Sequence, residues 1–155
     1  MDGGLAPEAF SDPQRGDDVG ARGCPGEQAL LACDAVMGKL LVHVTHGPEA
    51  PTRAALAFLV ARAAIEEGHQ VTMFLAGDSV QLLRGAVLDE LHGLGTGALR
   101  EHFDALSASG VPIYASGVSS KARGVTAADI SDSVTMAPPT RLVQLAFEAD
   151  RVLTY

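Results

Sequence analysis

The sequence predicts an α/β domain over residues 37–155, built as a three-layer, doubly wound and mostly parallel five-stranded sheet. Two observations lead to this fold class. Apolar segments rich in branched residues alternate with segments of helical character, which favours strand–helix–strand units over separate α and β regions. The clearest of these apolar segments, KLLVHVT at 39–45, is almost continuously apolar. Such runs are typical of strands buried on both faces, as in parallel sheets.

The first strand–helix–strand unit lies between residues 39 and 76. Residues 39–45 are the first predicted strand, and the following helix begins at Pro51 or Thr52 and ends at Glu67. Gly68 then stands at the favoured left-handed position after a helix. Residues 69–76 are the second strand, and its connection to the first is expected to be right-handed. The helix should pack through Leu56, Leu59, Val60, Ala63 and Ala64.

The remaining elements follow the same alternation. Gly77, Asp78 and Ser79 offer a cap for a short helix over 80–83, and we expect only one helical turn in the glycine-punctuated stretch 85–97. The later strands are predicted at 111–115, 133–137 and 150–155, and the later helices at 98–109 and 138–149. Between the third and fourth strands we expect a loop with a helical turn at 116–124 and a second short turn at 126–130.

Residues 1–36 differ from the rest of the chain. They are rich in Gly, Pro, Asp and Ala, show no sustained apolar period up to Gly26, and hold seven acids against two arginines. This composition predicts a flexible acidic extension, with a short helix over 27–36. Because Met37 directly precedes the first strand, two interpretations remain open. Either the extension is native, or the native chain starts at Met37 and the upstream segment is a mis-annotated start.

The overall composition restricts the partners of the chain. Its formal net charge of -8 disfavours nucleic acid, whose phosphates would be repelled. No apolar run approaches the roughly 20 residues that span a membrane, and the start lacks the basic and then apolar layout of a secretory signal. We therefore expect a cytoplasmic protein without a membrane partner. Both cysteines, Cys24 and Cys33, lie in the first segment, so no disulfide framework supports the fold.

A ligand site is expected where the parallel strands end, near the switch point of the sheet. The stretch after the third strand, 116–124, is the most distinctive, because it carries three hydroxyls and two cations. Lys121 and Arg123 could clamp an anion together with backbone amides of the turn. They could equally be a solvated basic loop or pair across a subunit interface. The candidate ligand-binding residues are His46, Asp78, Ser116, Gly117, Ser119, Lys121 and Arg123.

Other chemistries find less support in the residues. Ser116 as a nucleophile would need a base and an orienting acid, and although His43 and His46 are near along the sheet edge, no acid is fixed by spacing. The same two histidines lack a third ligand for zinc. No phosphate-binding G-x-x-x-x-G-K-[ST] segment occurs. We assign no catalytic residue, expect no metal site, and expect no cofactor.

Four segments in order resemble one protein family. They are HGP at 46–48, EEGHQVTMF at 66–74, GVPIYASGVSSKARG at 110–124 and LAFEADRVLTY at 145–155. Together they resemble the DsrE/F-like (DsrE/TusD/YchN-type) family over essentially all of residues 37–155. The resemblance implies a five-stranded α/β fold with flavodoxin-like layering and assembly into homo-oligomers, commonly trimers or hexamers. It also implies a relation to intracellular sulfur relay, in which family members pass persulfide sulfur by means of a cysteine in this region.

The chain departs from the family at that cysteine. Relatives often have Val-Cys-Gly after the third strand, whereas this chain has Ala115-Ser116-Gly117. A serine hydroxyl cannot hold a persulfide, because that chemistry needs a thiolate. The resemblance therefore implies a non-catalytic subunit that binds a small anionic or sulfur-containing ligand or serves as an accessory chain. The alternative is a persulfide carrier, at most a sulfurtransferase-like protein, that uses Cys24 or Cys33.

Overall fold

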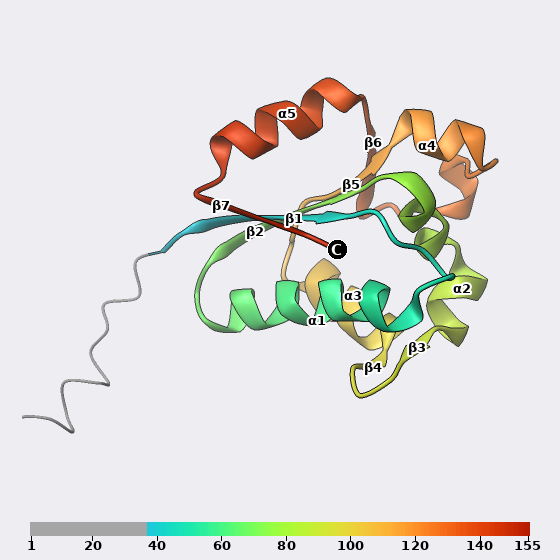
Figure 1. The fold of residues 1–155 in the computed structure, drawn as a ribbon, viewed down its shortest axis with the longest axis horizontal. Helices are drawn as coiled ribbons and strands as arrows, with labels where there is room; N and C mark the ends of the chain where they lie inside the picture. The colour runs from blue at the N-terminus through green and yellow to red at the C-terminus, as the bar shows by residue number, and fades with distance from the viewer. Residues whose placement is uncertain (1–36) are drawn as a thin grey trace, which may run out of the picture. The chain divides into compact units, whose positions relative to one another are not determined.

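The structure is a computed structural model that describes residues 37–155. Its centre is a five-stranded sheet in the order β6-β5-β2-β1-β7, and every neighbouring pair of strands is parallel (Figure 1). The predicted fold class is confirmed, and all five strands lie where they were expected. Their bounds are β1 Lys39–Val44, β2 Gln70–Leu75, β5 Ile113–Ser116, β6 Val134–Ala137 and β7 Arg151–Thr154.

Helices cover the two faces of this sheet unequally. Helices α1 (Pro51–Glu66) and α3 (Leu99–Ala108) lie on one face, and α5 (Pro139–Glu148) lies on the other (Figure 1). The α1 side holds most of the core, including Val42, Phe58 and Met73, each fully buried. The α5 side holds a small cluster of four buried residues, Leu41, Phe74, Ala137 and Leu145. One face is therefore thickly packed and the other thinly.

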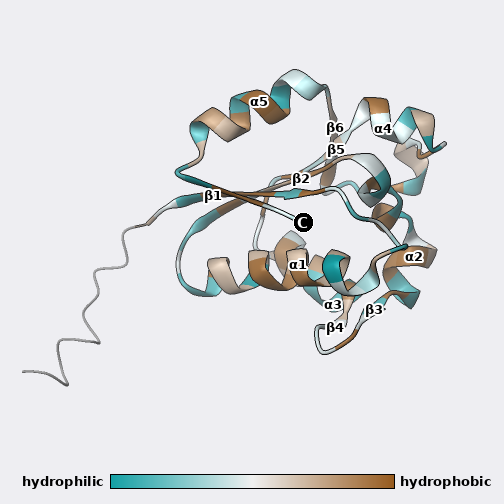
Figure 2. Ribbon diagram, in the orientation of Figure 1, coloured by the Kyte–Doolittle hydropathy of each residue, from teal (hydrophilic) through white to brown (hydrophobic). Residues whose placement is uncertain are grey.

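Helix α1 has the predicted span but presents a different side to the core. Its buried residues are Ala54, Ala55, Ala57, Phe58, Ala61 and Ala64, so of the five residues predicted to face inward only Ala64 does. The prediction was wrong because apolar residues occur on every side of this helix (Figure 2), and periodicity alone then selects no face. The alanines allow the helix to approach the sheet closely. Gly68, with φ of +84°, ends the helix turn as predicted.

The stretch from Gly77 to Ala98 differs from its prediction in two ways. A 3-10 helix, η1 (Gly77–Leu83), begins earlier than expected and has no side-chain cap, so Asp78 and Ser79 do not cap a helix there. Beyond it come helix α2 (Gly85–Glu90) and a two-stranded antiparallel ribbon of β3 (His92–Gly93) and β4 (Gly97–Ala98). The ribbon was not predicted, because strands of two residues leave no periodic signal.

The segment after β5 is more helical than predicted. Residues expected as a loop with a turn form helix α4 (Gly117–Ala122), and the second turn is a 3-10 helix, η2 (Ala127–Asp129). Thr126 and Asp129 form a reciprocal capping box at η2, with Asp129 Oδ2 2.7 Å from both the Thr126 amide and its hydroxyl. Helix α4 is important for the site, because its first turn lies at the carboxyl end of β5.

Several expectations fall outside residues 37–155. The acidic extension, the helix over 27–36 and the choice between the two chain starts all concern residues that the structure does not describe. Within the described residues, no helix combines the length and the hydrophobicity needed to cross a bilayer.

Candidate functional site

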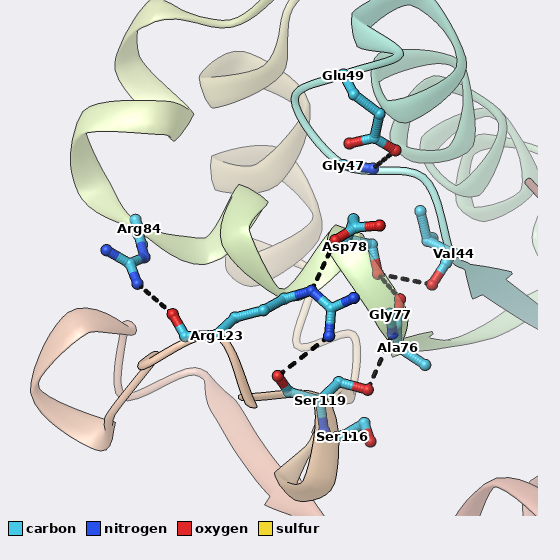
Figure 3. A network of polar contacts seen from close by, with 11 residues as sticks. Val44, Gly47, Glu49, Ala76, Gly77, Asp78, Arg84, Ser116, Ser119 and Arg123 are labelled. Atoms are coloured by element: carbon cyan, nitrogen blue, oxygen red, sulfur yellow. Dashed lines mark hydrogen bonds and ion pairs between the residues drawn. The ribbon is translucent and has the colours of Figure 1, made fainter. Parts of the chain in front are cut away.

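The carboxyl ends of β1, β2 and β5 form one edge of the sheet, because the three strands are parallel neighbours. The strand ends, loops and short helices at this edge carry all seven predicted site residues. The structure joins four of them in one polar network, namely Asp78, Ser116, Ser119 and Arg123 (Figure 3). The other three, His46, Gly117 and Lys121, have no side-chain bond to this network.

Ser116 ends β5 and caps α4. Its Oγ accepts a hydrogen bond from the Ser119 amide at 3.4 Å, and its side chain is buried. Ser119 in turn accepts a hydrogen bond through Oγ from the Gly77 amide at 3.0 Å. A serine is a favoured helix cap, so this local structure follows from the residue type. The two bonds tie the loop after β5 to the loop after β2.

Arg123 and Asp78 form the central ion pair of the network. Arg123 Nε lies 2.7 Å from Asp78 Oδ1, and the two side chains are 28% and 51% exposed. Arg123 Nη1 also lies 3.5 Å from the Ser119 carbonyl oxygen. An ion pair this exposed contributes little to stability, about 0–1 kcal/mol. A competing anion can therefore displace Asp78 from Arg123 at a small cost in free energy.

Arg84 belongs to the same region and was not identified from the sequence. Its Nη2 donates to the Arg123 carbonyl oxygen at 2.8 Å (Figure 3). It also donates to the Gly124 carbonyl oxygen at 3.2 Å, and the two bonds satisfy the end of α4. Its Nε is buried and has no hydrogen-bond partner among the described residues. Arg84 lies 39 residues before Arg123, and no pattern along the chain links the two.

The ends of β1 and β2 are held by Ser79 and Gly47. The fully buried Ser79 hydroxyl lies 2.7 Å from the Val44 carbonyl oxygen and 2.6 Å from that of Ala76. Gly47 lies directly on the backbone of Asp78, where a Cβ atom would meet the Asp78 carbonyl oxygen and come within 2.7 Å of its carbon. Only glycine fits this contact, so the loop after β1 is pressed against the residue that pairs with Arg123.

His46 lies on the same edge but is bonded elsewhere. Its Nε2 is 3.2 Å from Arg53 Nη1 and its Nδ1 is 3.4 Å from Thr45 Oγ1. Because Arg53 can only donate, Nε2 accepts and Nδ1 carries the proton. Within residues 37–155, no hydrogen bond joins a histidine to Ser116, so the base that a serine nucleophile requires is not in place.

His43 and His46 do not converge on a common point. The His43 ring lies beside Phe74, with ring centroids 6.2 Å apart, and its buried Nε2 has no partner among the described residues. Burial lowers the pKa of His43 below its usual 6.5. Across residues 37–155, no group of three His, Cys, Asp or Glu side chains is arranged to hold a metal ion.

The charges at this edge favour an anion. Arg84, Arg123 and the exposed Lys121 bring three cations to this edge, against two carboxylates, that of Asp78 and that of Glu49, whose Oε1 accepts a hydrogen bond from the Gly47 amide at 2.7 Å. No ion pair of Lys121 is found within the described residues. Hydroxyls of Ser116 and Ser119 retain protons that can donate. The arrangement can therefore bind a small anion, and the described residues bring no thiol to it, since Cys24 and Cys33 precede residue 37.

Comparison with known structures agrees with this fold. The chain is similar in structure to the YchN protein from E. coli, with a TM-score of 0.66 and 24% identity over 77% of this chain and 100% of the other. It is also similar to MTH1491, a protein of unknown function from Methanobacterium thermoautotrophicum, with a TM-score of 0.57 and 15% identity over 76% of this chain and 99% of the other. Both likenesses concern the fold alone.

Among curated proteins, none matches the sequence. The model of the DsrE/DsrF-like family, however, matches residues 38–155. This match spans all five strands of the sheet and the whole polar network at its carboxyl edge. The chain therefore belongs to the DsrE/DsrF-like family.

Proposed function

We propose that this chain is a cytoplasmic binding or accessory subunit related to the sulfur-relay proteins of its family, and that its domain holds a small anionic or sulfur-containing ligand without carrying sulfur itself. The site is the carboxyl edge of β1, β2 and β5. Lys121 and Arg123 supply positive charge, Ser116 and Ser119 supply hydroxyls, and His46, Asp78 and Gly117 border them.

The observation that carries this proposal is the location of the thiols. Both cysteines, Cys24 and Cys33, precede the residues that match the family. Persulfide transfer proceeds by attack of a thiolate on sulfur, and a hydroxyl cannot replace it. In our proposal Ser116 occupies the position of the family's carrier cysteine, where its hydroxyl caps α4. The domain then keeps a binding site but not the transfer chemistry.

Anion binding is supported by the state of Arg123. Its guanidinium is held by one half-exposed carboxylate and one long contact to a carbonyl, which leaves N–H groups free to bind a ligand. The ion pair between Arg123 and Asp78 also predicts opposite effects on anion affinity for substitutions of its two members. Arg123→Ala should weaken binding, whereas Asp78→Asn should strengthen it, because the guanidinium loses its internal counter-ion.

Calorimetric titration of the full chain with thiosulfate, sulfite and inorganic phosphate tests this. We expect saturable binding of at least one anion, a loss of about tenfold for Arg123→Ala, in line with a charge-assisted contact worth about 1.5 kcal/mol, and a gain for Asp78→Asn. Arg62→Ala, which removes an exposed cation paired with Glu66 on α1, is the matched control and should change nothing. Equal binding by all four proteins would refute the site.

Mass spectrometry tests the second half of the proposal. The full chain and its Cys24→Ser/Cys33→Ser variant are incubated with polysulfide, and the intact mass of each protein is measured before and after addition of reductant. If the chain is a binding subunit, the double replacement leaves anion binding unchanged. If instead the full chain gains the mass of bound sulfur, the reductant removes that gain and the double replacement abolishes it, the chain is a persulfide carrier and the proposal is wrong.

Self-assembly is also part of the proposal, as a trimer or a hexamer. It is supported by the exposed apolar residues of α5, since Phe147 is 88% and Val143 56% exposed and they lie one helical turn apart. Large exposed apolar groups that lie together usually mark a contact surface. The thin packing of the α5 face agrees with an additional layer supplied by another copy.

A further inference from the structure

One of the two edges of the sheet is formed by β7, a strand with two apolar residues at its centre. β7 ends the strand order, and its central residues Val152 and Leu153 are 45% and 39% exposed. Tyr155 bonds β1 through both its amide and its carbonyl. By the alternation of a parallel ladder, the amides and carbonyls of Val152 and Thr154 therefore point away from the sheet. Native proteins usually protect such edges, because unpaired backbone groups beside apolar side chains recruit another strand.

A groove runs along this edge at the amino end of β1. It encloses about 340 Å³ and is lined by Gly38, Lys39, Leu40, His69, Arg151, Val152 and Leu153. Leu40 and Leu153 point to the same face of the sheet and form an apolar floor. One wall is fixed, because His69 Nδ1 accepts a hydrogen bond from the Gly38 amide at 3.3 Å. The groove is far along the strands from the anion site, which lies at their carboxyl ends.

The charge of the groove is opposite to that of the molecule. The chain carries a net charge of -8, yet the groove is lined by two cations, Lys39 and Arg151, and by no acid. The Asp150 carboxylate lies next to Lys39 and accepts a hydrogen bond from its amide at 2.8 Å. Neither cation forms an ion pair within residues 37–155. This positive rim around an apolar floor favours a partner that carries both acidic and apolar groups.

We propose that the edge of β7 is a docking site for a short extended segment of a partner protein in which apolar and acidic residues alternate. The segment adds a sixth strand through backbone hydrogen bonds to β7. Its apolar side chains lie on the face of the sheet that carries Leu40 and Leu153, where Arg151 borders them, and its alternate carboxylates lie on the opposite face, which carries Lys39. The four residues of β7 set its length, since four residues at about 3.3 Å each extend roughly 13 Å.

The test measures binding of a fluorescent probe peptide, Glu-Val-Glu-Val-Glu-Val, to the full chain by anisotropy. Two further probes separate the contributions. The peptide with lysine in place of glutamate tests the charge, and the peptide with alternate N-methylated amides tests the backbone pairing. We expect saturable binding of the acidic peptide only, with both altered peptides weaker by about tenfold or more.

Variants then locate the site. Leu153→Glu places a carboxylate on the apolar floor, and Arg151→Glu reverses the rim charge, so each should weaken binding about fivefold or more. The matched controls are Leu94→Glu, at a residue 90% exposed in the β3–β4 ribbon, and Arg62→Glu on α1, and both should bind as the parent does. Circular dichroism checks that each variant is folded.

Three results would overturn the proposal. They are no saturable binding of the acidic peptide at millimolar concentration, equal binding of the lysine or N-methylated peptide, and equal loss in the control variants. Light scattering on the same samples shows whether Leu153→Glu dissociates the protein. If it does, β7 is covered by a second copy of this chain, and the partner proposed here is wrong.

Discussion

At the scale of single residues, His43 has a measurable consequence for stability. Its pKa in the folded protein lies below the usual 6.5, because half-burial beside Phe74 disfavours the charged ring. Its Nε2 has no hydrogen-bond partner among the described residues to offset that cost. The folded state therefore binds fewer protons than the unfolded chain whenever the pH lies between the two pKa values.

The sign of the pH dependence follows from this difference. The stabilisation is fully present above about pH 6.5 and is lost as the pH falls through the folded pKa, because the unfolded chain then takes up a proton that the folded state resists. We expect the melting temperature to fall between about pH 7.5 and 5.5 and expect His43→Leu to flatten that fall. The exposed His92→Leu is the control. A His43→Leu protein with the parent's slope would contradict the argument.

Ser116 shows how one residue decides between two kinds of chemistry. As a helix cap it satisfies the Ser119 amide and positions the first turn of α4. As a nucleophile it would need a histidine that the described residues do not bring to it. Ser116 lies at the carboxyl end of β5, the place where a site is expected in a parallel sheet, and its part in a site stays a prediction. Only the structure shows that its hydroxyl accepts a hydrogen bond from the Ser119 amide.

At the scale of elements, the close contact between Gly47 and η1 is the most restrictive feature of the site. A Cβ atom at Gly47 would come within 2.7 Å of the Asp78 carbonyl carbon, which is backbone and cannot rotate away. We expect Gly47→Ala to push the loop after β1 away from η1 and to lower the free energy of unfolding by about 1–3 kcal/mol. Because Asp78 would move, anion affinity should change with it.

Urea denaturation measures the first effect and calorimetry the second. Gly85→Ala at the start of α2 is the matched control, because a Cβ there meets no atom within 4 Å. That variant should be as stable as the parent, or more stable by about 0.4–1 kcal/mol through the unfolded chain. If both substitutions had the same small effect, the loop would not be in close contact with η1 in solution.

The elements also show what a sequence can predict and where it stops. The sequence predicts strands β1 and β2 from continuous runs of branched apolar residues, and the end of α1 from Gly68. These signals lie within a few neighbouring residues, so they can be recognised without the fold. The inward side of α1 was not predictable, since apolar residues surround it and only packing against the sheet selects Ala57 and Phe58. The Asp78–Arg123 pair joins residues 45 positions apart, and no local pattern encodes it.

At the scale of the whole molecule, the two faces of the sheet differ in a way that bears on assembly. Parallel sheets are normally covered on both faces, and here α5 alone covers most of one face while its outer side carries Val143 and Phe147. The two apolar surfaces, the β7 edge and the stripe of Val143 and Phe147 on α5, differ in charge. Lys39 and Arg151 beside the β7 edge form no ion pair within the described residues, whereas Arg141 of α5 pairs with Glu148. We therefore assign the edge to a peptide and the stripe to self-assembly.

This assignment predicts different responses to two substitutions. Burial of Phe147 between copies would contribute about 2 kcal/mol, so Phe147→Glu should weaken self-association by roughly thirtyfold and move the light-scattering mass towards the monomer. The fold should be unaffected, because the side chain is 88% exposed. Leu94→Glu, equally exposed in the ribbon, should keep the parent's mass. An oligomer that persists in Phe147→Glu, or a parent that is monomeric at every concentration, would mean that α5 does not join the copies.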